Sequence, residues 1–168
     1  MNTATRLGKF RLGAGALAFA CASFAAAAGG ASGSIDYAHK NAAVKYAWLI
    51  EGPDDMQPGK TLRRLYFSAT DIGAKLAACA SLSCADGSVS EGATIDFAKD
   101  ARHLGYWVVL NGQKVQYSGG TEPAAFTIKT DARDRLAGHV HIDDAAAGGA
   151  KIDADFDAAL LKSVTSAH

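Results

Sequence analysis

The most regular alternation of hydrophobic and polar residues lies near the end of the chain, over residues 135–161. Side chains of a β-strand point to opposite faces with a period of two residues, so this pattern predicts strands with one apolar and one polar face. A run of small residues, 144–150, separates the two alternating segments and predicts the loop of a hairpin. The expected apolar face consists of Val140, Ile142, Ile152, Ala154 and Phe156, and the expected polar face of His139, His141, Asp143, Asp153, Asp155 and Asp157.

The same criterion predicts about eight strands in all, separated by turn residues. In the first of them, Val44, Tyr46, Trp48 and Ile50 share one face, which we expect to be the core face. Asn111-Gly112 predicts a tight hairpin turn, because both central residues of such a turn take positive φ. The remaining predicted strands are 64–70, 93–97, 104–110, 114–117 and 126–128.

Residues 72–82 form the only predicted helix of any length, with Asp71 as its candidate cap. Because the strands follow one another without long helical crossovers, the pattern predicts an all-β, mainly antiparallel fold. We expect a β-sandwich of immunoglobulin-like architecture or a small barrel, with one short helix. This single domain covers residues 35–168, and the Gly/Ala/Ser-rich residues 29–34 are predicted to be a flexible leader.

Residues 1–28 have the layout of a secretory signal peptide: a basic start, an apolar stretch over 12–24 and four alanines, with cleavage expected after Ala28. The apolar stretch is short for a membrane span. We therefore predict a periplasmic or secreted protein. The alternative is a lipoprotein anchored through Cys21, although Ala18 stands where a lipobox normally has leucine.

Removal of the signal peptide changes the charge and the cysteine count. Residues 1–28 hold three of the 17 basic residues and none of the 17 acidic ones, which leaves a net charge of −3. That balance argues against nucleic acid as a partner, and no second apolar run is long enough for a transmembrane helix. Cys79 and Cys84 remain and are predicted to form a disulfide that pins a local turn, the alternative being two reduced thiols.

Two stretches of the mature chain resemble a group of small exported β-sandwich proteins from Gram-negative bacteria. They are the early strand Val44-Lys45-Tyr46-Ala47-Trp48 and the last hairpin, from Arg135-Leu136-Ala137-Gly138-His139 to Phe156-Asp157-Ala158. The resemblance implies an exported protein and assigns no catalytic residues.

The polar face of the last hairpin is the best candidate for chemistry. His141 is expected near Asp153 or Asp155, and His139 near Asp155 or Asp157. Imidazole and carboxylate groups suit Zn²⁺ or Cu²⁺, so His139, His141 and Asp155 form a candidate metal site, which His103 would join from another strand. The alternatives are a solvated face of weak ion pairs, or Ca²⁺ on the aspartates, for which the loop lacks the usual spacing.

The chain contains none of the G-x-S-x-G, H-E-x-x-H or P-loop motifs, so we predict no catalytic residues and no cofactor. A hydrolase using Ser68, Ser88 or Ser118 with His103 is the weaker alternative. Tyr66 and one of Tyr106 and Trp107 are expected to face outward, where they would favour binding. The leading prediction is an exported, non-catalytic binding or structural module of the envelope or periplasm, with a protein, glycan or small ligand as partner. The alternative is a periplasmic Zn or Cu protein using His139 and His141.

Overall fold

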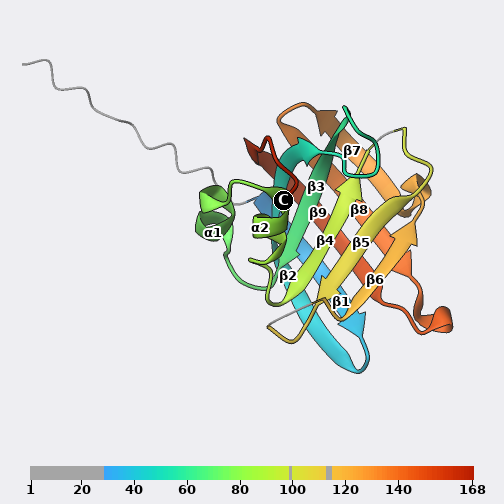
Figure 1. The fold of residues 1–168 in the computed structure, drawn as a ribbon. Coiled ribbons are helices and arrows are strands. Elements are labelled where there is room, and N and C mark those ends of the chain that lie inside the picture. Colours follow the sequence, from blue (N-terminus) through green and yellow to red (C-terminus); the bar gives the residue numbers. More distant parts are fainter. Residues whose placement is uncertain (1–28, 99, 113–114) are drawn as a thin grey trace, which may run out of the picture.

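The computed structural model describes residues 29–168, apart from residues 99 and 113–114, so the predicted signal peptide and Cys21 lie outside the described residues. Nine strands form one sheet, in the order β6-β5-β4-β3-β2-β1-β9-β8-β7, which curls like half a barrel (Figure 1). The strands are β1 (Gly29–Tyr37), β2 (Lys40–Pro53), β3 (Thr61–Ser68), β4 (Gly92–Phe97), β5 (Leu104–Val109), β6 (Tyr117–Thr121), β7 (Phe126–Ala132), β8 (Arg135–Asp143) and β9 (Lys151–Ser163). Short 3-10 helices span Pro123–Ala125 and Ala145–Ala147.

The all-β, mainly antiparallel class predicted from the sequence is confirmed, but the described strands belong to one curled sheet and not to two facing sheets. Strands β1 to β5 each pair with the next strand along the chain, β7 pairs with β8 and β8 with β9, and β9 returns to pair with β1. The nine described strands thus form one continuous sheet. Where β1 begins, β2 and β9 pair directly in parallel, with Leu49 opposite Leu160. Residues 118–120, which lie outside the strands predicted from the sequence, belong to β6.

Phenylalanine side chains fill the concave side of the sheet. Phe67 and Phe156 meet edge to face with ring centroids 5.6 Å apart, and Phe97 and Phe126 do the same at 5.4 Å. Such aromatic pairs add to the stabilisation from buried area. The predicted alternation of the last hairpin holds, because Phe156 is buried while the Asp155 side chain is 61% exposed.

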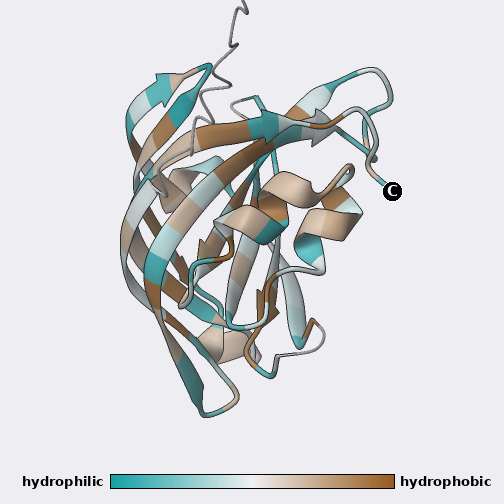
Figure 2. Cartoon of the chain, turned by 90° about the vertical axis from the view of Figure 1, so that its left-hand side faces the viewer, coloured by the Kyte–Doolittle hydropathy of each residue, from teal (hydrophilic) through white to brown (hydrophobic). Residues whose placement is uncertain are grey.

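Two short helices, α1 (Gly73–Ala78) and α2 (Leu82–Asp86), lie at one side of the curled sheet and bury a second apolar cluster (Figures 1 and 2). Tyr46, Trp48 and Ile50 pack there, whereas Val44 packs in the concave core. The prediction that these four residues share one core face was wrong for Val44. The β1–β2 register shifts opposite Val44 and Tyr46, so the alternation of β2 changes face there, and the helices then cover the outer face that carries the other three residues.

The structure has two helices where the sequence predicted a single helix over residues 72–82, and the break between them begins at Cys79. Asp71 accepts a hydrogen bond from the Gly73 N–H at 2.9 Å, close to its predicted capping role. Ser81 caps the second helix by accepting from the Cys84 N–H at 3.2 Å. The Cys79 and Cys84 sulfur atoms lie at bonding distance, 2.12 Å, as the cysteine count predicted.

Replacing both cysteines by alanine is expected to lower the free energy of unfolding by about 2 kcal/mol, because the covalent loop is short and restricts the unfolded chain little. Urea unfolding of the variant, beside the wild type with and without dithiothreitol, measures the loss. Reduction of the wild type should match the variant. A far larger loss would mean that the whole α1–α2 segment depends on the link.

Strand β1 includes residues 29–34, for which the sequence predicted a flexible leader. The strand is paired on both sides, with β2 and with β9. A Cβ on Gly29 would lie 2.1 Å from the Asp157 carbonyl oxygen, and one on Gly33 would lie 2.0 Å from that of Asp153. The small residues that suggested a flexible segment are therefore what lets this strand fit between its neighbours.

Candidate functional site

The polar faces of β8 and β9 lie side by side on the convex surface of the sheet. Their antiparallel register sets His141 opposite Asp153 and His139 opposite Asp155. The interior positions between them, such as Val140 and Ala154, are buried and fix the two strands against the core. The register thus selects one of the two pairings that the sequence left open for each histidine.

Three side chains on this face converge. The ligating atoms of His139, His141 and Asp153 all lie within 4.8 Å of one another. His139 Nε2 is 3.6 Å from Asp153 Oδ1, and His141 Nδ1 is 2.9 Å from Asp153 Oδ2. Two ligands on a tetrahedral zinc ion stand about 3.3 Å apart, given a metal–nitrogen distance of about 2.0–2.1 Å. Small side-chain rotations would therefore bring the three groups into one coordination sphere.

Asp153 differs from the other aspartates of this face in its partners. Each of the others is beside a permanently charged side chain, whereas Asp153 faces the two imidazoles and forms no ion pair with Lys or Arg in the described part of the chain. The permanent pairs are Asp143 with Lys151, Asp155 with Lys129, and Asp157 with Arg135. The carboxylate of Asp153 is thus not balanced by a permanent positive charge and can bind a cation.

Asp155, the predicted third ligand, occupies a different place. Its Oδ1 lies 3.5 Å from His139 Nδ1, the ring nitrogen other than the one directed at Asp153. A carboxylate in that position orients a ligating imidazole and raises its basicity. His103 does not belong to this cluster among the described residues, since it lines a pocket beside Trp107.

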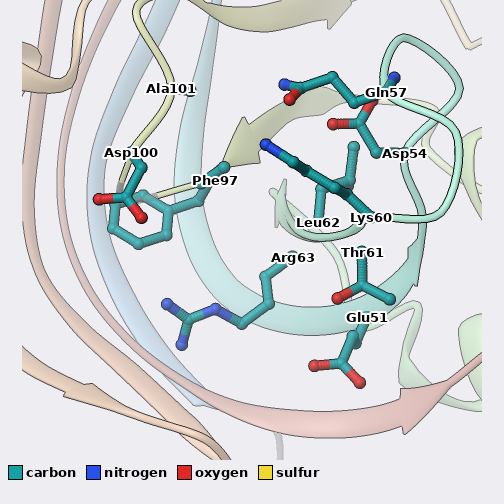
Figure 3. Close-up of a pocket in the computed structure, with 11 residues that line it drawn as sticks. Glu51, Asp54, Gln57, Lys60, Thr61, Leu62, Arg63, Phe97, Asp100 and Ala101 are labelled. Atoms are coloured by element: carbon teal, nitrogen blue, oxygen red, sulfur yellow. The ribbon is translucent and has the colours of Figure 1, made fainter.

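A polar pocket of about 270 Å³ opens at one end of the curled sheet (Figure 3). The basic side chains of Lys60 and Arg63 stand there among the acidic side chains of Glu51, Asp54 and Asp100. Arg63 donates to the Ala132 carbonyl at 2.9 Å and lies 2.5 Å from Asp131, so it ties β3 to β7. These contacts already satisfy the charge of Arg63, so its role in the pocket is to connect strands of the sheet and not to bind an anion.

The aromatic residues expected to face outward divide between surface and interior. Tyr66 and Tyr106 are fully buried, and Trp107 is half-buried on the outer face. Tyr106 donates a hydrogen bond to Asp144; burial, together with this bond, raises the pKa of the tyrosine. Only Trp107 is therefore in a position to contribute to a binding surface in the way the sequence suggested.

In the described part of the chain, none of the three serines considered for a hydrolase forms a hydrogen bond with a histidine. Ser68 is buried and accepts from the Thr70 N–H, Ser88 donates to the Cys84 carbonyl, and Ser118 is exposed on β6. His103 lines a different part of the surface. This arrangement supplies no nucleophile–base pair from the candidates that the sequence offered.

The fold and site together define a curled antiparallel sheet with a histidine–aspartate cluster on its outer face. Comparison with protein-family models, with curated proteins and with solved structures finds no match to this chain. Within residues 29–168, as far as they are described, no helix is both long enough and apolar enough to cross a membrane.

Proposed function

We propose that this protein is an exported, non-catalytic binding module of the envelope or periplasm that holds Zn²⁺ or Cu²⁺ on the outer face of β8 and β9. The observation that carries the proposal is the convergence of His139, His141 and Asp153 within 4.8 Å. Export is supported by the signal-peptide pattern of residues 1–28 and by the cysteine pair at disulfide distance.

In this proposal His139 binds the ion through Nε2, while its Nδ1–H is directed at Asp155. Asp153 and His141 complete a set of three protein ligands. The cluster lies at the surface, with the His141 side chain 62% exposed, so the remaining coordination positions face solvent. Three protein ligands with an open position allow an ion to be exchanged, unlike the closed four-ligand sites that hold structural zinc. The module would therefore carry or buffer the metal and would not depend on it for folding.

The first measurement is a calorimetric titration of the chelator-treated protein with ZnCl₂ and CuCl₂. One ion is expected to bind per chain. Asp153→Asn and His141→Ala should each weaken binding at least about tenfold, because each removes one of three ligands. Asp155→Asn should weaken binding by a smaller factor, because this residue acts through His139.

Asp143→Asn is the matched control. It removes one carboxylate from the same face, but from a residue that is already paired with Lys151. Metal affinity should stay within about twofold of the wild type, since only long-range charge is lost. If the double variant His139→Ala/His141→Ala binds either ion as tightly as the wild type does, the face is a set of solvated ion pairs and the proposal fails.

A further inference from the structure

A second pocket, of about 350 Å³, lies between the β2–β3 loop and the outer face of β5. Met56 and Leu62 contribute apolar surface from one side and Trp107 from the other. Met56 is 89% exposed, which is unusual for a large apolar side chain and leaves it available to a ligand. The pocket is separate from the histidine–aspartate cluster, so what it binds does not depend on the metal proposal.

Glycines create the space beside Trp107. Gly105 lies two residues before the tryptophan on the same face, and a Cβ there would be 2.9 Å from the indole ring. Gly120 is paired with Gly105 across β5 and β6, and a Cβ at that position would meet nothing within 4 Å. The indole therefore packs on β5 at Gly105, where no side chain intervenes. The neighbouring surface of β6 at Gly120 is open to a ligand.

Trp107 already makes one cation–π contact. The Arg64 guanidinium carbon is 4.8 Å from the centroid of the indole ring. Arg64 is buried, and Asp86 and Asp96 balance its charge. It therefore does not repel a cation that enters the pocket.

The rim of the pocket is acidic. Asp54 and Asp96 line it, and no described lining residue is Lys or Arg. Burial raises the pKa of Asp96, Arg64 opposes this effect, and the negative charges of Asp54 and Asp55 raise the pKa further. Asp86 and Asp96 together exceed the single positive charge of Arg64, and Asp54 adds a further carboxylate at the rim, so the charge beside the indole is negative overall.

We propose that this pocket binds a small organic cation, an ammonium group carried on an apolar body, between Trp107 and the carboxylate of Asp54. The aromatic ring and the acidic rim attract the charge, and Met56 and Leu62 contact the apolar body. Recognition of substituted ammonium groups by aromatic side chains rests on the same attraction between a cation and the negative face of the ring.

The test compares choline with 3,3-dimethylbutan-1-ol, a neutral molecule of nearly the same shape. The indole N–H signals of the two tryptophans are followed by ¹⁵N NMR during each titration. Choline should shift the Trp107 signal and bind at least about tenfold more tightly than the alcohol, the difference that desolvated cation–π contacts produce. The buried Trp48 should report no direct contact.

Substitutions of pocket residues test whether choline binds at this position. Asp54→Asn should weaken choline binding about threefold, because it removes one rim charge but keeps the oxygen that accepts from the Met56 N–H. Trp107→Leu should weaken it about tenfold, and Trp107→Phe should retain most of the affinity and the folded state. Asp134→Asn, which removes an exposed carboxylate from the β7–β8 turn, is the control and should change nothing.

Equal binding of choline and the alcohol would overturn the cation proposal, as would choline binding that Trp107→Leu leaves unchanged in a folded variant. Absence of any choline-induced shift would overturn it too. The double variant His139→Ala/His141→Ala should bind choline as the wild type does, so failure of the metal site and failure of this pocket give different results.

Discussion

Replacing Arg64 by methionine is expected to lower the free energy of unfolding by about 2–3 kcal/mol, because it leaves two partly buried carboxylates, Asp86 and Asp96, without their cation. Arg64 lies on β3, is 9% exposed, and faces the outer cluster beneath α2. Methionine keeps much of the length and apolar volume of the side chain, so the loss reports mainly on charge and hydrogen bonding.

The contacts of Arg64 explain the size of the effect. Its Nε and Nη2 donate to the two oxygens of Asp96 at 2.6 and 3.2 Å, and its Nη1 donates to Asp86 at 2.7 Å. Tyr66 donates to the other oxygen of Asp86 at 3.0 Å. The guanidinium thus joins α2, β3 and β4 in one partly buried network, and removing it takes hydrogen-bond donors from several acceptors at once.

Arg135→Met is the matched control. Arg135 makes a two-bond contact with Asp157, but the two side chains are 56% and 45% exposed. Water solvates the aspartate when the arginine is lost, so the expected change is below about 1 kcal/mol. Urea unfolding of both variants provides the comparison. Equal losses would show that burial does not set the strength of the Arg64 network.

The loss in Arg64→Met is also expected to depend on pH. In the wild type, burial raises the pKa of Asp86 and Asp96 and Arg64 opposes this rise. Without Arg64 both pKa values lie further above their unfolded values, so the folded variant binds more protons than the unfolded chain. Its stability therefore falls as pH rises from the unfolded pKa to the folded one. The difference from wild type should be smallest near pH 4 and full above the raised pKa.

The last hairpin shows what the sequence can predict. Its alternation of apolar and polar residues depends only on the period of a strand, and the burial of Phe156 with the exposure of Asp155 follows from it. The histidines were found from the same alternation. The third member of their cluster was not, because the choice between Asp153 and Asp155 depends on side-chain rotation that the period does not determine.

The Arg64 network shows what the sequence could not predict. Arg64 alternates with Leu65 and Phe67, a pattern that is equally typical of a solvated face. Its partners are 22 and 32 residues away in the sequence, so no local pattern indicates the pairing. The packing of α2 against this face of the sheet has no signal in the local sequence. For the same reason the sequence did not predict that Tyr46, Trp48 and Ile50 belong to a second cluster, separate from the one that contains Val44.

Replacing Gly33 by alanine is expected to lower the free energy of unfolding by on the order of 3 kcal/mol, in the range of severe single substitutions. A Cβ at this position would lie 2.0 Å from the Asp153 carbonyl oxygen and 2.6 Å from the Ala154 Cα. Both are backbone atoms of β9, so no side-chain rotation relieves the clash. The positive φ of Gly33, 153°, is a further cost for any residue with a Cβ.

Gly30→Ala is the control in the same strand, since a Cβ there would meet nothing within 4 Å. It should leave stability within about 1 kcal/mol of the wild type, because the only change is a restriction of the unfolded chain. Urea unfolding gives the free energies, and hydrogen exchange of the β1 amides shows whether the strand detaches. Equal behaviour of the two variants would mean that residues 29–34 are the flexible leader that their composition suggested.

The Gly33 variant also links the fold to the proposed metal site. Ser34 is paired with Asp153 and Gly33 with Ala154, so the backbone that positions Asp153 rests on β1. If β1 is displaced, Asp153 loses its fixed position relative to His139 and His141, and Zn²⁺ affinity should fall in Gly33→Ala but not in Gly30→Ala. A variant that unfolds more easily yet binds Zn²⁺ normally would show that β8 and β9 position the three ligands without help from β1.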